Sequence, residues 1–102
     1  MAPSSLSADR QVTVRTLLYM NYVYFIKSIK NNWVYVGSTV NLEVRFQQHN
    51  KGEVKSTSFY KPFDLVYYES YPTIHKARLR ERKIKSSSFE KDKILKKIGV
   101  RL

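Results

Sequence analysis

The sequence predicts an α/β (α+β) domain in which a three-stranded antiparallel sheet is flanked by helices. Two runs dense in aromatic and β-branched residues follow each other across a short polar turn, as in a β-hairpin. A third run of this kind comes after one helical segment, and two further helical segments follow it. A chain of 102 residues builds one hydrophobic core, so we expect a single domain.

The predicted domain spans residues 20–99. Residues 1–19 begin with a proline and several serines and show no sustained hydrophobic periodicity before Val12. Such a segment is typical of a flexible leader. Met20 directly precedes the first strand-like run, and we therefore place the domain boundary there.

The first two strands are predicted at residues 21–29 and 33–37, with a polar turn between them. Alternate residues of a strand face the same side of a sheet. If the hairpin loop holds an even number of residues, Tyr24, Tyr35 and Gly37 share one face. Two phenol hydroxyls would then lie on one surface.

The first helix is predicted over residues 42–50. Good N-capping residues precede it at Ser38–Asn41, and Gly52 provides a stop signal. Arg45 and His49 are four positions apart, a spacing that places side chains on the same face of a helix. A basic, polar loop leads from this helix to the next strand.

The third strand is predicted at residues 63–71. The second helix is predicted to run from Ile74 to the three serines at 86–88, with Thr73 as its N-cap. A last helix is predicted over about residues 89–98, where isoleucines and a leucine form one apolar side before a glycine.

Glu81 has an unusual position on the second of these helices. At 3.6 residues per turn the apolar stripe consists of Ile74, Ala77 and Ile84, and Glu81 falls in its middle. A carboxylate on a stripe that faces the core is costly unless another group pairs with it. Arg80, in contrast, is predicted to point into solvent, together with the neighbouring lysines.

The charge of the chain indicates a polyanionic partner. Nineteen Lys and Arg residues stand against eight Asp and Glu residues, which gives a formal charge of +11 and a strong positive field. We expect nucleic acid, bound mainly through phosphate contacts. A surface that is only solubilised by lysines is one alternative. A protein of the membrane surface is another, and it is less favoured because no single amphipathic helix collects the charge.

The composition excludes several kinds of site. The chain has no cysteine and two histidines, which rules out disulfides and thiolate metal sites and disfavours a histidine-rich zinc site. A catalytic metal would therefore be held mainly by oxygen. No apolar run approaches the roughly 18 residues of a membrane helix, and the N-terminus lacks a secretory pattern. We expect an intracellular protein of the cytoplasm and nucleoid, or of the nucleus.

Each candidate residue also has a structural explanation. Tyrosine in a strand usually packs against neighbours, and an arginine and a histidine on one helix face are usually solvated. Glu81 is explained equally well by a buried ion pair, for instance with Arg45 or Lys85, and by a functional role. Several tyrosines and Trp33 are suited to stacking on bases, although packing within the sheet is more common.

Taken in order, these residues resemble the GIY-YIG nuclease family. Residues 22–24 (Tyr-Val-Tyr) stand where that family has Gly-Ile-Tyr, and residues 35–37 (Tyr-Val-Gly) stand in place of Tyr-Ile-Gly. Arg45 and His49 follow at the spacing of the family. The resemblance covers about residues 20–86 and is closest to the small stand-alone members. It continues through Lys55, Thr57, Pro62, Tyr67, Glu69, Ala77 and Glu81.

Two departures from the family pattern stand out. Tyr22 replaces the first glycine of the name motif. Some family nucleases also have an asparagine after the last helix of the match, and here residues 86–88 are serines. We therefore predict no asparagine partner for the site.

The resemblance implies hydrolysis of a DNA phosphodiester bond with one divalent ion. Glu81 would hold Mg²⁺ or Mn²⁺ together with waters and a phosphate oxygen. Arg45 would form two charge-assisted hydrogen bonds to the scissile phosphate. Tyr24 would orient or deprotonate the attacking water, Tyr35 would orient the phosphate or water beside it, and His49 would support Tyr24 through a hydrogen bond.

A tyrosine has a pKa near 10, so it is a weak base at neutral pH unless nearby cations lower that pKa. We expect Arg45, His49 and the metal to provide such an environment for Tyr24. The predicted nucleic-acid contacts are Gly37, which lets backbone approach the site, and two lysines of the following loop, Lys51 and Lys55.

Two alternatives to the enzyme remain open. One is a nucleic-acid-binding module without catalysis. The other is an adaptor in DNA repair or recombination that acts only within a larger complex, because no separate DNA-reading domain is visible in the sequence. The DNA structure that is cut and the oligomeric state do not follow from the sequence.

Overall fold

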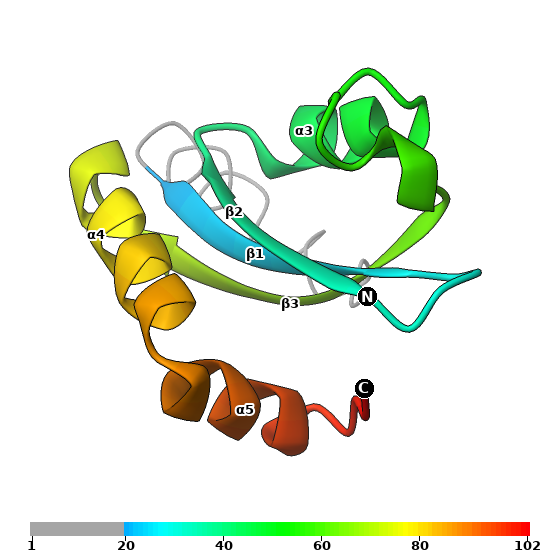
Figure 1. Ribbon diagram of the computed structural model, residues 1–102. Helices are drawn as coiled ribbons and strands as arrows, with labels where there is room; N and C mark the ends of the chain where they lie inside the picture. The colour runs from blue at the N-terminus through cyan, green and yellow to red at the C-terminus, as the bar shows by residue number, and fades with distance from the viewer. Residues whose placement is uncertain (1–19) are drawn as a thin grey trace, which may run out of the picture.

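The computed structural model describes residues 20–102 (Figure 1). The leader predicted at residues 1–19 lies outside the described residues. The described part confirms the α+β fold class. Its elements are β1 (Asn21–Ser28), β2 (Val34–Thr39), α3 (Leu42–Asn50), a short 3-10 helix (Ser58–Tyr60), β3 (Phe63–Tyr71), α4 (Ile74–Ser86) and α5 (Ser88–Lys97).

The three strands form one antiparallel sheet in the order β2-β1-β3, so β1 is the central strand. Tyr24 is paired with Gly37 and Ile26 with Tyr35. Directly paired residues of an antiparallel ladder lie on the same face of a sheet. The prediction that Tyr24, Tyr35 and Gly37 share one face is therefore confirmed.

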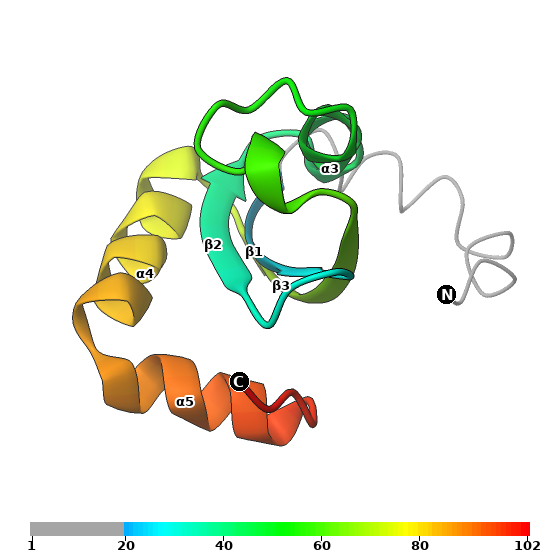
Figure 2. The same ribbon diagram turned by 45° about the vertical axis from the view of Figure 1, so that its right-hand side comes forward.

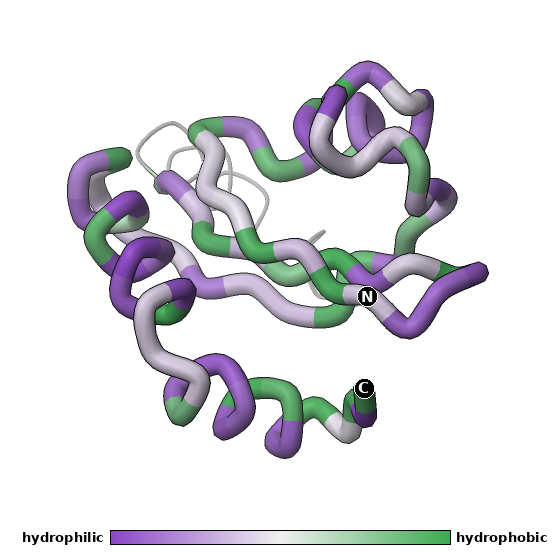
Figure 3. Tube along the Cα trace, viewed as in Figure 1, coloured by the Kyte–Doolittle hydropathy of each residue, from purple (hydrophilic) through white to green (hydrophobic). Residues whose placement is uncertain are grey.

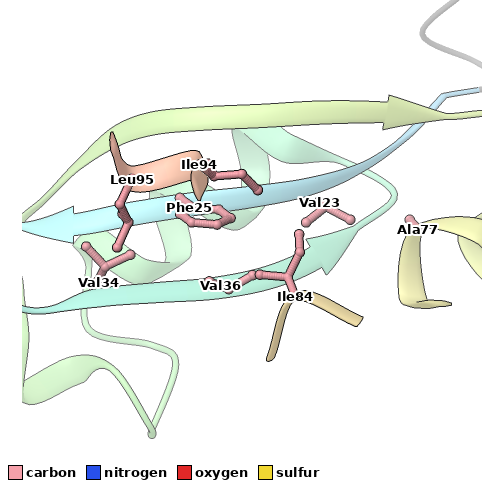
Figure 4. Close-up of a cluster of buried hydrophobic side chains, with 8 residues drawn as sticks. All are labelled: Val23, Phe25, Val34, Val36, Ala77, Ile84, Ile94 and Leu95. Atoms are coloured by element: carbon pink, nitrogen blue, oxygen red, sulfur yellow. The ribbon is translucent and has the colours of Figure 1, made fainter. Parts of the chain in front are cut away.

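The sheet separates two hydrophobic clusters. Helices α4 and α5 pack on one face and α3 on the other, as Figures 1 and 2 show. In Figure 3, hydrophobic residues of α5 lie on its side toward the sheet. The first cluster consists of Val23, Phe25, Val34, Val36, Ala77, Ile84, Ile94 and Leu95 (Figure 4). The second consists of Tyr24, Ile26 and Phe63, against which Trp33, Tyr35, Leu42, Phe46 and Tyr60 pack.

The polar residues that begin the helices satisfy their free backbone N–H groups, as capping requires. Asn41 accepts a hydrogen bond from the backbone of Val44, and Thr73 accepts one from Lys76. Capping also explains the predicted break between the helices at residues 86–88. Ser87 ends α4 and caps α5, which turns the chain so that both helices reach the same face of the sheet.

The expectation that Arg80 points into solvent is wrong. Its guanidinium donates to Glu69 on β3, with Nε 2.9 Å from Oε1, and to Glu90 on α5, with Nη1 3.1 Å from Oε1. The Arg80 side chain is only 23% exposed. The physical reason is that β3 and α5 both place a carboxylate beside this flank of α4, and an arginine between them is paired rather than solvated.

Within residues 20–102, none of the helices combines the length and the apolar character that crossing a membrane would require.

Candidate active site

The centre of the candidate site is a chain of three buried polar side chains. Tyr24 Oη lies 2.8 Å from Nε2 of His49, and Nδ1 of His49 lies 2.8 Å from Oγ1 of Thr57. All three residues are at most 1% exposed. Helix α3 brings His49 over Tyr24 because Leu42 and Phe46 pack on the same face of the sheet. The predicted hydrogen bond between Tyr24 and His49 is present.

Burial sets the protonation of this pair. It raises the pKa of Tyr24 to about 12, although the nearby Arg45 guanidinium acts in the opposite direction. Burial also lowers the pKa of His49 to about 4, and the positive charge of Arg45 adds to that effect. In the metal-free protein at neutral pH, Tyr24 is thus protonated and His49 is neutral. The expected lowering of the Tyr24 pKa is not found here, because desolvation outweighs the one cation that acts on it.

Gly37 provides the space in which Tyr24 lies. A Cβ atom added at Gly37 would be 2.6 Å from Tyr24 Oη and 2.7 Å from Cζ, far inside contact distance. Gly37 is itself buried under the tyrosine ring. Tyr35 is half-buried on the same face, with its ring centroid 6.4 Å from that of Tyr24 and 5.2 Å from that of His49.

Arg45 stands on α3, at the edge of the site. Its Nη1 donates to Oε1 of Gln48 at 3.0 Å, which holds the guanidinium in place. Arg45 and Gln48 line a hollow of about 360 Å³ together with Ser38 and Arg78. No pattern in the sequence pointed to Gln48, since a glutamine three positions after an arginine is common on exposed helices.

Glu81 reaches the site from α4. Its side chain is 21% exposed, and both carboxylate oxygens have partners. Lys85 Nζ lies 2.7 Å from Oε2, and the Ser38 hydroxyl donates to Oε1. Lys85 Nζ also lies 5.3 Å from the centroid of the Tyr35 ring. An ion pair with Lys85 is therefore present, but it is not the buried pair considered for Glu81, because the Lys85 side chain is 48% exposed.

The site is built around the edge of the sheet rather than on one face. Tyr35 and Gly37 point to the face that α3 covers, whereas Ser38, the next residue of β2, meets Glu81 of the helix on the opposite face. Among the described residues β2 pairs only with β1, so both sides of this strand reach the same edge. A hollow of about 490 Å³ next to it is lined by Ser38, Arg78, Glu81, Arg82, Lys85 and Ser86.

The donor atoms at this edge agree in kind with a hard divalent ion. The Glu81 carboxylate and the Ser38 hydroxyl offer oxygen, the ligand atom that Mg²⁺ and Mn²⁺ prefer. Within residues 20–102 no group of three or more histidine, aspartate or glutamate side chains converges on one point. An ion held here would keep most of its coordination shell for water and substrate, as Mg²⁺ commonly does.

The remaining candidates lie farther out or serve packing. Lys51 and Lys55 are exposed on the loop that follows α3. Trp33 stacks on Tyr60 at 3.8 Å between ring centroids, so its ring is used within the protein. Tyr68 is 54% exposed and retains a free surface for stacking.

The chain is similar to a known catalytic domain and to several small bacterial proteins. The model of the GIY-YIG family, described as the GIY-YIG catalytic domain, matches residues 20–93. A UPF0213 protein of Pediococcus pentosaceus is 34% identical over 87 residues, which cover 83% of this chain and 92% of the relative. A UPF0213 protein of Staphylococcus haemolyticus is 39% identical over 82 residues, or 79% of this chain and 96% of the relative. No solved structure gives a significant match.

Proposed function

This chain belongs to the GIY-YIG family, and on that basis we propose that it is a metal-dependent DNA endonuclease. It would hydrolyse phosphodiester bonds with a single divalent ion, Mg²⁺ or Mn²⁺. The observation that carries the proposal is the buried hydrogen bond between Tyr24 and His49, 2.8 Å long, beside Tyr35. A buried tyrosine held at one angle is suited to orienting a water molecule.

The substrate phosphate is bound by cations of two helices. Arg45 presents a planar guanidinium that is suited to two hydrogen bonds with a phosphate, and it opposes the charge that builds in the transition state. Glu81 and Ser38 would hold the metal, which when bound polarises the phosphate and stabilises the developing charge. Lys85, which pairs with Glu81 without metal, would then be free to contact phosphate.

Water is the nucleophile in the proposed reaction. Its oxygen forms a bond to phosphorus while one P–O ester bond breaks, so that one product ends in a phosphate and the other in a hydroxyl. The Tyr24 oxygen accepts a hydrogen bond from this water and orients it, and Tyr35 fixes its position from the side. With a pKa of about 12 before substrate and metal bind, Tyr24 must first lose its own proton to solvent, which nearby positive charge favours by lowering that pKa. The phenolate then takes the proton of the attacking water, and the departing ester oxygen takes a proton from solvent.

A second candidate function is supported by the ion pair between Glu81 and Lys85. Because Lys85 Nζ lies 2.7 Å from the Glu81 carboxylate and neutralises it, the site forms a basic surface without needing a metal ion. A nucleic-acid-binding module without catalysis, or an adaptor that acts only within a DNA repair or recombination complex, would be expected to remain in this state.

A cleavage assay with a charge-removing variant distinguishes the two functions. The substrates are plain, nicked and branched DNA duplexes, each with Mg²⁺, with Mn²⁺ and with EDTA. Wild-type protein should cut with a divalent ion only, and Glu81→Gln should lose nearly all cleavage but still bind DNA. Glu43→Gln, which removes an exposed carboxylate of α3, should cut like wild type. Binding without cleavage of every substrate would instead support the second function.

A further inference from the structure

Among the three hydrogen-bonded buried residues Tyr24, His49 and Thr57, only Thr57 has no role in the proposed reaction. It lies between α3 and the 3-10 helix, is 0% exposed, and contacts His49 on the side away from Tyr24. Its role depends on a single proton. A threonine hydroxyl donates one hydrogen bond, and here two acceptors compete for it.

The first acceptor, the carbonyl oxygen of Val54, is already occupied. It accepts the backbone N–H of Thr57 at 3.1 Å and that of Ser58 at 3.0 Å, and a carbonyl oxygen has two lone pairs. The Thr57 hydroxyl is 3.4 Å from this oxygen but 2.8 Å from Nδ1 of His49. The hydroxyl proton therefore goes to His49.

A neutral imidazole carries a proton on only one of its nitrogens. If Nδ1 accepts from Thr57, Nε2 must be the protonated nitrogen. His49 is neutral here because burial holds its pKa at about 4. The 2.8 Å contact between Nε2 and Tyr24 Oη is then a hydrogen bond that His49 donates and the tyrosine oxygen accepts.

We propose that Thr57 is a positioning residue of this site, whose hydroxyl holds His49 in the Nε2-protonated tautomer so that the imidazole donates to the oxygen of Tyr24. The proton of Tyr24 is then directed away from His49 and toward the substrate side. His49 stabilises negative charge on the Tyr24 oxygen and does not receive its proton. This inference deepens the proposed nuclease function and rests on it for its catalytic meaning, but the tautomer itself does not depend on cleavage.

Nitrogen-15 NMR of the full-length, metal-free protein measures the tautomer directly. Long-range proton–nitrogen correlations distinguish a protonated ring nitrogen from an unprotonated one, and a His75→Gln variant assigns the signals, because the chain has two histidines. We expect Nε2 of His49 to be protonated and Nδ1 to be unprotonated. Protonation at Nδ1 in the wild-type protein would overturn the proposal, whatever the cleavage assay shows.

Two substitutions test whether Thr57 sets that tautomer. Thr57→Val keeps the shape but removes the hydroxyl, so signals of the second tautomer should appear and kcat should fall about tenfold with KM unchanged, the rate equivalent of one hydrogen bond. Thr57→Ser should retain the wild-type tautomer and most of kcat. Ser58→Ala, which removes the hydroxyl next in sequence, should change neither. A folded Thr57→Val protein with the wild-type tautomer and rate would show that Thr57 only fills space.

Discussion

Tyr24 is confined by groups that leave its hydroxyl one position. Nε2 of His49 lies 2.8 Å from the Tyr24 oxygen. Any residue larger than glycine at position 37 would collide with the Tyr24 side chain. An enzyme gains from such confinement because a group that is already in place needs no reorganisation during the reaction. The cost is a desolvated phenol with a pKa of about 12.

Tyr24→Phe should therefore separate folding from chemistry. The ring that packs in the core remains, so the thermal midpoint should change little, whereas kcat should fall by about 10² to 10⁴, the span for a general acid–base group. Tyr68→Phe is the matched control, because Tyr68 pairs with Tyr24 across the sheet and its side chain is exposed. Equal cleavage rates for the two variants would remove Tyr24 from the mechanism.

In the proposed reaction Lys85 would compete with the metal ion for Glu81. Its ammonium lies 2.7 Å from the carboxylate, where it must be displaced before an ion can bind, so Lys85→Met should tighten Mn²⁺ binding in the absence of DNA. Titration calorimetry or the EPR signal of free Mn²⁺ measures the dissociation constant. Lys83→Met on the exposed side of the same helix should leave it unchanged. Weaker Mn²⁺ binding by Lys85→Met would contradict competition.

Two relations among the candidate residues could be predicted from local patterns, although only the family resemblance singled these residues out as a site. Alternation along the two strands of the hairpin predicts that Tyr24 and Tyr35 share one face of the sheet. A spacing of four residues predicts that Arg45 and His49 share one face of the helix. The hydrogen bond from Ser38 to Glu81 connects positions 43 apart, and no local pattern encodes it. The sequence presents Ser38 as a helix-capping residue, although Asn41 is the residue that caps α3.

At the scale of the elements, Arg80 joins three of them. It links α4 to Glu69 of β3 and to Glu90 of α5. The helix wheel alone placed Arg80 on the solvent side, and this prediction is wrong because the side chain is paired and only 23% exposed. What the wheel could not show is that the neighbouring elements each contribute a carboxylate there, which depends on how α5 folds back after α4.

This network makes stability depend on pH. Burial alone raises the pKa of Glu69, but hydrogen bonds from Arg80, Tyr67 and Tyr71 outweigh burial and lower the pKa to about 2, below the ordinary value of 4.5. A carboxylate with a lowered pKa stabilises the fold above its unfolded-state pKa, and that contribution is lost as pH falls toward the folded-state pKa. Thermal midpoints should therefore decrease as the pH falls from about 4.5 to about 2.

The matching variant is Glu69→Gln, which removes the charge but keeps the shape. Its thermal midpoint should be lower than that of wild type at pH 7, and the difference should shrink as the pH falls through the same window. A constant difference across that window would show that the charge of Glu69 contributes nothing to stability.

For the molecule as a whole, charge should control binding. A formal charge of +11 and basic side chains around the hollows beside Glu81 and Arg45 indicate contacts to phosphate rather than to base edges. The affinity for duplex DNA should fall steeply as the salt concentration rises. Each phosphate contact should contribute about −0.9 to the slope of log K against log salt concentration. Fluorescence anisotropy at several salt concentrations measures this slope. A flat plot, or affinity that depends strongly on sequence, would contradict phosphate-dominated binding.

The central strand also divides the molecule into parts that can change separately. Val23 and Phe25 face the cluster under α4 and α5, while Tyr24 and Ile26 face the cluster under α3. Substitutions in the first cluster would adjust thermal stability with Tyr24 and His49 undisturbed, which relaxes the usual conflict between stability and activity. New substrate preferences could evolve through substitutions on the face that α3 covers, while the residues under α4 and α5 keep the fold stable. Glu81 is the exception, because its helix packs on the stabilising face and reaches the site around the sheet edge.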